Sequence, residues 1–167
     1  LEHFFASQNP PTAILAMSLV FALPGAAKVQ ITTETTTPVA TATANNGAAA
    51  NVEITAAGSV KLDEQPGATA VTINSSNTVT NAGTISITDS NNATGVRIIP
   101  GITGGYTATG SISILEDYTR TDTDNGQDND GPLAQGTGRA GILVDPGGTL
   151  NGNINLGTAA VVTVEGN

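Results

Sequence analysis

The amino-acid sequence predicts an all-β fold: a parallel β-helix, or solenoid, of about four coils of ~25 residues, preceded by a signal-peptide helix. Three observations lead to this prediction. A short strand motif beginning with glycine recurs at a nearly constant spacing. Aromatic residues are only 3% of the chain, so any core must be built from Val, Ile, Leu and Ala. An apolar run near the start of the chain is typical of a signal peptide.

The first recurring element is a five-residue strand in which apolar residues alternate after an initial glycine. It occurs at residues 58–62 (GSVKL), 83–87 (GTISI) and 110–114 (GSISI), and more loosely at 152–156 (GNINL). A second element occurs at residues 70–73 (AVTI), 95–98 (GVRI) and 141–144 (GILV). The first element repeats after 25 residues, from Gly58 to Gly83, and after 27 more, at Gly110. This period fits a coil of two or three short strands and is too short for a four-stranded propeller blade.

Stacking of such coils places equivalent apolar residues in columns. The expected columns are Val60, Ile85 and Ile112; Leu62, Ile87 and Ile114; Val71, Val96 and Ile142; and Ile73, Ile98 and Val144. The residues expected to face water are Lys61, Ser86, Ser113, Thr72 and Arg97. Corners with positive φ are expected at Asn81 to Gly83, Asn91 with Asn92, and Gly147 with Gly148, because Gly and Asn tolerate that conformation.

Residues 1–27 are predicted to be a secretory signal peptide. Residues 13–23 (AILAMSLVFAL) contain Ser18 as their one polar residue, and eleven residues are too few to span a membrane as a helix. Pro24 ends the run, and the small residues that follow are those a signal peptidase recognises, which predicts cleavage between Ala27 and Lys28. The alternative is a buried core helix, although the run is apolar on every side.

Residues 28–50 are rich in Thr and Ala and are expected to form a leader or loose cap with little capacity for a packed core, since Pro38 interrupts the Thr run. The β-helix body is expected over residues 51–167. The chain begins at Leu1 rather than Met and ends at Asn167 just after a strand-like run, which indicates a fragment of a longer polypeptide.

An insertion is predicted at residues 115–139. Gly110 and Gly141 are 31 residues apart where the repeat predicts 12, so about 19 residues are added. The added segment is acidic and is expected to bulge from the coil as an exposed loop. Its carboxylates Asp122, Asp124, Asp128 and Asp130 are the one group dense enough for a metal, and alternating oxygen ligands suit Ca²⁺. An EF-hand is not matched, because Leu133 stands where its bidentate Glu belongs. A hydrated acidic loop without metal is the favoured interpretation.

Charge and composition exclude several classes of function. The net charge of −9 disfavours nucleic acid as a partner. The chain has no Cys, and its one His, His3, lies in the signal region, which excludes thiol catalysis and a Ser-His dyad in the mature part. The predicted outward positions offer Ser, Thr, Lys61, Arg97 and Asn155, without a carboxylate pair at coil spacing to flank a glycosidic bond. No catalytic residue and no cofactor is therefore predicted.

Three stretches resemble passenger domains of alphaproteobacterial autotransporters. These are residues 78–87 (TVTNAGTISI), residues 141–154 (GILVDPGGTLNGNI) and the insertion, which is similar to a loop recurrent in sphingomonad members. The resemblance implies a right-handed β-helix, Sec export, and a carboxy-terminal outer-membrane β-barrel translocator downstream in the same polypeptide. It also implies a location at the cell surface or outer membrane, or outside the cell.

The expected function is that of a non-catalytic surface passenger, a stalk or adhesin-like module whose host or surface ligand the sequence does not identify. Two alternatives stay open. One is a β-helical carbohydrate-active surface enzyme with its active region outside this chain, and the other is a secreted β-solenoid binding module.

Overall fold

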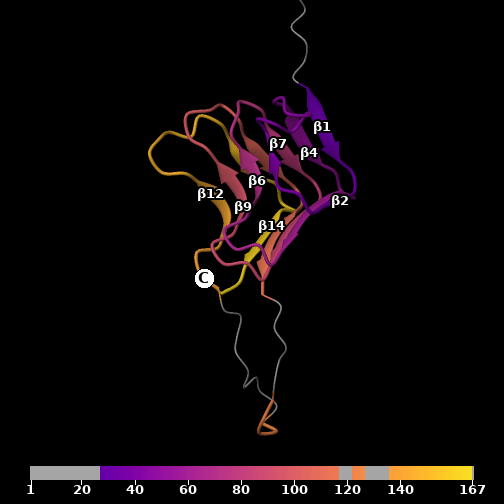
Figure 1. Cartoon of the computed structure of the whole chain (residues 1–167), viewed down its shortest axis with the longest axis vertical. Helices are drawn as coiled ribbons and strands as arrows, with labels where there is room; N and C mark the ends of the chain where they lie inside the picture. Colours follow the sequence, from indigo (N-terminus) through magenta and orange to yellow (C-terminus); the bar gives the residue numbers. More distant parts are fainter. Residues whose placement is uncertain (1–26, 117–121, 127–135, 167) are drawn as a thin grey trace, which may run out of the picture.

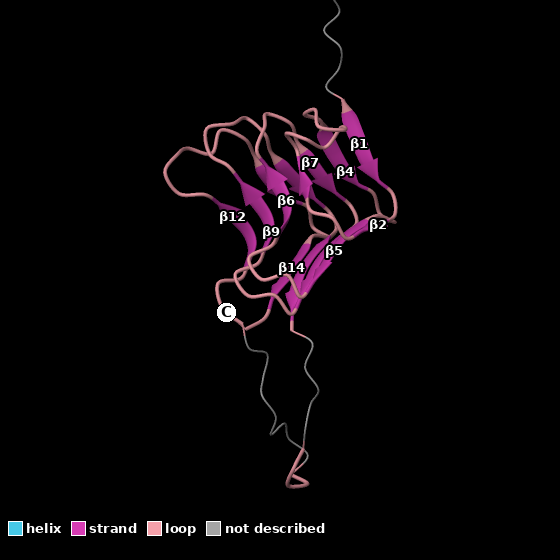
Figure 2. Ribbon diagram, viewed as in Figure 1, coloured by secondary structure: helices cyan, strands magenta, loops and turns pink. Residues whose placement is uncertain are grey.

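The structure is a computed structural model that describes residues 27–116, 122–126 and 136–166. The signal segment, apart from Ala27, lies outside the described residues. Every regular element in the described part of the chain is a β-strand, and fourteen strands follow one another without a helix (Figures 1 and 2). The predicted all-β class is confirmed.

The strands form three sheets in which all pairings are parallel. Sheet A contains β1 (Lys28–Ile31), β4 (Asn51–Ile54), β7 (Val79–Asn81), β10 (Tyr106–Ala108) and β13 (Ile154–Leu156). Sheet B contains β2 (Glu34–Thr35), β5 (Ser59–Asp63), β8 (Thr84–Thr88), β11 (Ser111–Leu115) and β14 (Val161–Val164). Sheet C contains β3 (Val39–Ala40), β6 (Thr69–Ile73), β9 (Thr94–Ile98) and β12 (Ala140–Val144).

The chain visits the three sheets in strict rotation. Each strand is hydrogen-bonded to the strands three places before and after it in the sequence, so a full circuit of A, B and C separates neighbours. Parallel neighbours cannot be joined by a tight hairpin, and here the connection runs through the other two sheets. We call one circuit of three strands a turn.

The predicted apolar columns are confirmed. In sheet B, Ile85 is paired with Val60 and Ile112, and Ile87 is paired with Leu62 and Ile114. In sheet C, the column of Val71, Val96 and Ile142 and the column of Ile73, Ile98 and Val144 are both in register. Except for Ile142 and Val144 in β12, the edge strand of sheet C, all these residues belong to the buried core.

Sheet A was not recognised as a separate repeat, and one assignment that follows from this is wrong. Residues 152–156 resemble the first element, but Ile154 is paired with Tyr106 in sheet A. The fourth strand of sheet B is β14, where Val162 is paired with Ile112. The strands of sheet A that follow β4 are only three residues long, which is too short for an alternating pattern to stand out.

Residues 28–50 form three strands of the β-sheets, whereas the sequence predicts a leader or loose cap. They supply β1, β2 and β3, and each of these strands starts one sheet. Val39 is paired with Val71 despite the neighbouring Pro38. A strand at the edge of a sheet tolerates such a proline, because one side of it needs no partner.

The recurring glycine of the first element has a steric cause. A Cβ atom on Gly83 would lie 2.2 Å from the carbonyl oxygen of Gly58, and one on Gly110 would lie 2.1 Å from that of Gly83. The backbones of successive turns approach so closely at this corner that no larger residue fits. The glycine therefore marks contact between turns at the entry to sheet B.

The core contains one large aromatic residue that the composition did not suggest. Tyr106 is fully buried, and its hydroxyl accepts a hydrogen bond from Nδ2 of Asn81 at 3.1 Å. Asn81 is also buried, and its Oδ1 accepts the N–H of Gly83 at 3.0 Å. Asn81 therefore holds the corner with its side chain and does not adopt the positive φ expected of it, whereas Asn92 and Gly147 do.

Candidate functional site

The acidic insertion lies between sheet B and sheet C. The chain leaves β11 at Leu115 and enters β12 at Ala140, and the described residues between them contain no strand. In Figure 1 the described tip of the insertion, residues 122–126, lies below the sheets at the end that carries β14. The described ends of the insertion, which we call its stems, are Glu116 after β11 and residues 136–139 before β12, and the buried side chain of Arg139 contacts Glu116.

Arg139 holds the two stems together. Its side chain is only 1% exposed, and its guanidinium forms an ion pair with the carboxylate of Glu116, the first residue after β11. Its Nε donates to the carbonyl oxygen of Ser90 at 2.9 Å, and its Nη1 donates to that of Glu165 at 3.0 Å. One buried side chain thus contacts the same corner of three successive turns, after β8, β11 and β14.

The surrounding backbone strengthens this cluster. The Glu165 carboxylate accepts the N–H of Glu116 at 3.1 Å. On the returning stem, Thr137 donates its N–H to Oδ1 of Asn91 at 3.1 Å and accepts the N–H of Asn92 at 2.8 Å. A buried guanidinium is tolerated when charge-assisted hydrogen bonds replace the water it loses. The cluster fixes both ends of the insertion to the stacked turns.

Sequence analysis missed this cluster. The prediction treated the insertion as acidic and named no basic partner for Glu116. A usable signal was present: Arg139 is a lone cation directly before an apolar strand, and the stem it closes begins with a carboxylate. Neither feature indicates by itself that Ser90 and Glu165, 49 and 26 residues away along the chain, lie at the same place.

Of the four carboxylates proposed for calcium, Asp122 and Asp124 are described, whereas Asp128 and Asp130 lie outside the described residues. Oδ1 of Asp122 accepts the N–H of Asn125, and Oδ1 of Asp124 accepts the N–H of Gly126, both at 2.8 Å. Such bonds form tight turns within the loop. In the described part of the chain, no three His, Cys, Asp or Glu side chains come together in a way that could hold a metal ion.

Two ion pairs, Lys28 with Glu53 and Arg97 with Asp145, lie on or beside the outer faces of sheets A and C. On sheet A, hydrogen bonds from Gln30 and Lys28 lower the pKa of Glu53. Beside sheet C, two hydrogen bonds of 2.8 Å from Arg97 lower the pKa of Asp145. A general acid in glycoside hydrolysis needs the opposite shift, towards a raised pKa. These two carboxylates are therefore members of surface ion pairs and not candidates for that role.

The remaining outward positions are mostly hydroxyls. In sheet B, Ser59, Thr84 and Ser111 follow one another in register, and Ser86, Ser113 and Thr163 do the same two residues further on. Lys61 is exposed beside Ser86, as predicted. Such rows offer hydrogen bonds but no activated nucleophile, since a hydroxyl needs an adjacent base.

Comparison with family models, with curated proteins and with solved structures yields no match to this chain. Among the described residues there is no helix of the length and apolarity that crossing a membrane requires.

Proposed function

We propose that the chain is a section of a right-handed parallel β-helix and serves as a non-catalytic, surface-exposed or secreted passenger of an outer-membrane autotransporter. In this role the stacked turns act as a stiff spacer, and the acidic insertion is the part displayed to the surroundings. The chain carries its own export signal over residues 1–27.

The observation that carries the proposal is the strict rotation of strands through three parallel sheets with unbroken columns of Val, Ile and Leu. Each turn buries its apolar residues against the turns before and after it, so the stack can be lengthened by repetition without a new core. The right-handed sense follows the strong preference for right-handed connections between parallel strands of one sheet. A stiff rod of repeated turns suits a stalk better than an enzyme.

The arrangement at the insertion supports display of the acidic segment. Arg139, Glu116 and Glu165 fix its stems at one corner, so its length and composition can vary without disturbing the stacked columns. The described carboxylates in it, Asp122 and Asp124, belong to exposed residues. A fixed base beneath an exposed loop is a common arrangement for binding segments.

Export is tested by expressing the chain in a Gram-negative bacterium and determining the first residue of the periplasmic product. Lys28 is expected there. The variant Ala27→Tyr should block cleavage, because the peptidase requires a small residue at that position. Ala49→Tyr, at an exposed alanine in the next corner, is the matched control and should be processed normally. Retention of the chain in the cytoplasm would contradict the export proposal.

The passenger role is tested on the complete gene. Its reading frame downstream of Asn167 is expected to encode further glycine-led coils and then a terminal barrel of about 250–300 residues with alternating apolar segments. Protease added to intact cells should remove the acidic insertion, whereas a periplasmic marker protein should survive. Downstream coils with pairs of carboxylates at coil spacing would favour the enzyme. A downstream sequence without a barrel would favour a secreted binding module.

A further inference from the structure

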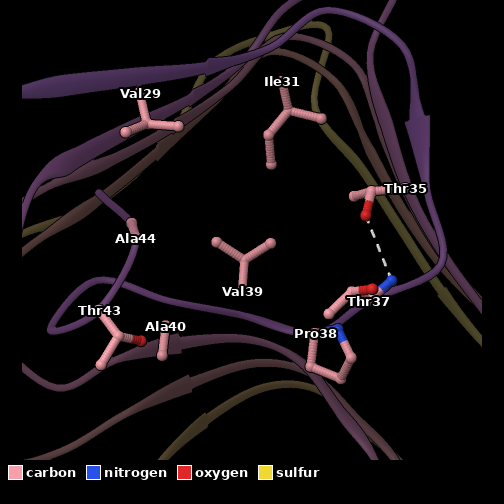
Figure 3. Close-up of a pocket in the computed structure, with 9 residues that line it drawn as sticks. All are labelled: Val29, Ile31, Thr35, Thr37, Pro38, Val39, Ala40, Thr43 and Ala44. Atoms are coloured by element: carbon pink, nitrogen blue, oxygen red, sulfur yellow. Dashed lines mark hydrogen bonds between the residues drawn. The ribbon is translucent and has the colours of Figure 1, made fainter. Parts of the chain in front are cut away.

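The amino-terminal end of the stack contains an open apolar cavity. It has a volume of about 280 Å³ and lies inside the first turn, between β1, β2 and β3. Val29, Ile31, Val39 and Ala44 line it from different sides, as Figure 3 shows. Val52 in β4 is 2% exposed, whereas Val29, its partner in β1, is only half-buried. The cavity is thus the apolar interior of the fold at an end that no described turn covers.

The backbone of β1 is also unpaired along one edge. Among the described strands β1 is hydrogen-bonded to β4 alone, and it has four residues, whereas β2 and β3 at the same end have two each. The carbonyl oxygens of Ala27 and Ile31 accept N–H groups at the two ends of β4. Because alternate residues of a strand point their N–H and C=O groups to opposite edges, those of Lys28 and Gln30 face the open edge. Such groups favour the addition of another strand.

This end of the stack carries no net charge, in contrast to the rest of the chain. The charged side chains in residues 28–50 are Lys28 and Glu34, which sum to zero. Residues 51–167 contain four Lys and Arg against twelve Asp and Glu, a net charge of −8. A lysine on an edge strand opposes pairing with another chain, but Lys28 forms an ion pair with Glu53. Two copies can therefore meet at this end without the repulsion that opposes contact elsewhere.

A second copy fits both the cavity and the open edge when its own β1 pairs antiparallel with this one. Side chains directly opposite each other in such a pair lie on the same face of the sheet. With Gln30 opposite Gln30 of the second copy, Val29 lies opposite Ile31, and both face the cavity. The N–H and C=O groups of the two Gln30 residues then exchange two hydrogen bonds. Contact between identical patches is the symmetric arrangement found in most dimers.

We infer that the mature chain, beginning at Lys28, pairs end to end with a second copy through β1. Sheet A then continues from one molecule into the other, and the two apolar cavities close on each other. The inference rests on the proposed function for the start at Lys28 and for the further coils that cover the opposite end. The insertion follows β11, towards that opposite end, so the two acidic segments lie away from the contact.

The test uses residues 28–167, which contain every described strand, released from a carrier protein by a protease that cuts directly before Lys28. The start of the chain is therefore fixed independently of the export signal. Gln30→Cys introduces the one thiol of the chain at the symmetry axis, where paired Cα atoms would be about 5.5 Å apart, a separation that suits a disulfide. Thr107→Cys is the matched control, because Thr107 is exposed in the same sheet but its strand has a neighbour on each side.

Gln30→Cys is expected to form a disulfide-linked dimer about tenfold faster than Thr107→Cys at equal protein concentration. Equal rates would overturn the inference. Asn155 lies in the same column of sheet A at the other end of the stack. If Gln30→Cys links to Asn155→Cys in a mixture faster than to itself, the copies stack head to tail and the inference is wrong. Failure of the proposed function is scored separately, by the downstream reading frame and the first residue of the exported product.

A second readout needs no disulfide. Sedimentation equilibrium of the chain without cysteine should show dimers, and a monomer at the highest soluble concentration would rule out the pairing. Gln30→Glu and Gln30→Lys each place like charges opposite each other and should weaken the dimer about two- to fivefold, whereas an equimolar mixture of the two variants should restore it. Thr107→Glu and Thr107→Lys are the controls and should leave association unchanged. Dimers that respond equally to both positions would place the contact elsewhere. Circular dichroism of each variant should show an unchanged β-spectrum.

Discussion

The second turn and the last turn contain the same column of sheet B but differ in exposure. Val60 in the second turn is 0% exposed, and Val162, in the last turn of the same column, is 43% exposed. Both residues are valines, and both occupy inward-facing positions of strands in which apolar and polar residues alternate. The difference is that Val60 has turns on both sides, whereas β14 forms the edge of sheet B. In this fold the side chains of a strand are fully buried when another strand of the same sheet lies on each side of it.

The same rule explains both ends of the described stack. Ile154, Leu156 and Val161 are exposed in the last turn, and Val29 and Ile31 are only half-buried in the first. Exposed strand edges with apolar side chains promote association with other chains. The strands of the middle turns have a partner on each side and bury their apolar side chains.

Gly83→Ala is expected to have the largest effect, because the contact between middle turns is closest at this corner. The new Cβ would lie 2.2 Å and 2.3 Å from two backbone oxygens, those of Gly58 and Thr55, so the turns must separate. A loss of about 3 kcal/mol or more in the free energy of unfolding is expected from chemical denaturation. Gly67→Ala is the control: no atom lies within 4 Å, and its φ of +77° should cost about 1 kcal/mol. Equal losses would show that the turns are not in close contact at Gly83.

Val60→Ala and Val162→Ala compare matched side chains in one column. Val60→Ala should lower the free energy of unfolding by about 2 kcal/mol, because it removes buried methyl groups and leaves a cavity. Val162→Ala should change it by less than about 1 kcal/mol, since that side chain already contacts water. Thermal or urea unfolding followed by circular dichroism measures both. Similar losses at the two positions would mean that Val162 is covered in solution.

Arg139→Met tests the cluster that fixes the insertion. The hydrogen bonds to the Ser90 and Glu165 carbonyls are lost, while Glu116, which is 24% exposed, can still be hydrated. A loss of about 1–3 kcal/mol is expected, together with faster proteolysis within the insertion. Arg97→Met removes an exposed ion pair from the outer face and serves as the control, with unchanged proteolysis expected. Equal proteolysis of both variants would show that Arg139 does not hold the stems.

Tyr106→Phe should cost about 0.5–1.5 kcal/mol, because Asn81 loses a hydrogen-bond partner in the core. Burial also raises the pKa of Tyr106 above its ordinary value of 10.0. The unfolded chain therefore loses this proton first as the pH rises, so the stabilising contribution is complete below pH 10 and declines above it. Stability measured between pH 8 and pH 11.5 should fall more steeply in the parent chain than in Tyr106→Phe. Parallel curves would indicate that the hydroxyl is accessible to water.

Calcium is expected to have no effect, because the insertion is interpreted as a hydrated acidic loop attached outside the stacked turns. Millimolar Ca²⁺ should leave the melting temperature unchanged in the parent chain and in Asp124→Asn with Asp128→Asn. A ligand that binds only the folded state must raise the melting temperature. A clear rise in the parent chain that the double variant abolishes would instead establish a calcium site.

Much of the fold could be predicted because the repeat can be recognised from short patterns of apolar, polar and glycine residues. Alternation of Ile with polar residues at 85–87 and 112–114 identifies strands and their inward side, and the spacing of the glycines aligns the strands of sheets B and C. Both signals depend only on residues a few positions apart and on a period that can be counted. Sheet A was not found as a separate repeat, because strands such as β7 and β10 are too short to display a period.

The tertiary structure alone decided the remaining features. The sequence determined an all-β chain with a repeating core, a break in the repeat at the acidic insertion, and the Gly that precedes β5, β8 and β11 in sheet B. It did not determine that Arg139 forms hydrogen bonds with the backbone of Ser90 and Glu165 and an ion pair with Glu116. Nor did it determine that Asn81 donates a hydrogen bond to Tyr106, or that the first turn encloses an open cavity. Each of these depends on which residues lie one turn apart, and the insertion changes that separation from 25 residues to 49 at the corner where Arg139 lies. A local pattern cannot specify a contact across a variable length of chain, because only the stacking of turns brings such residues together.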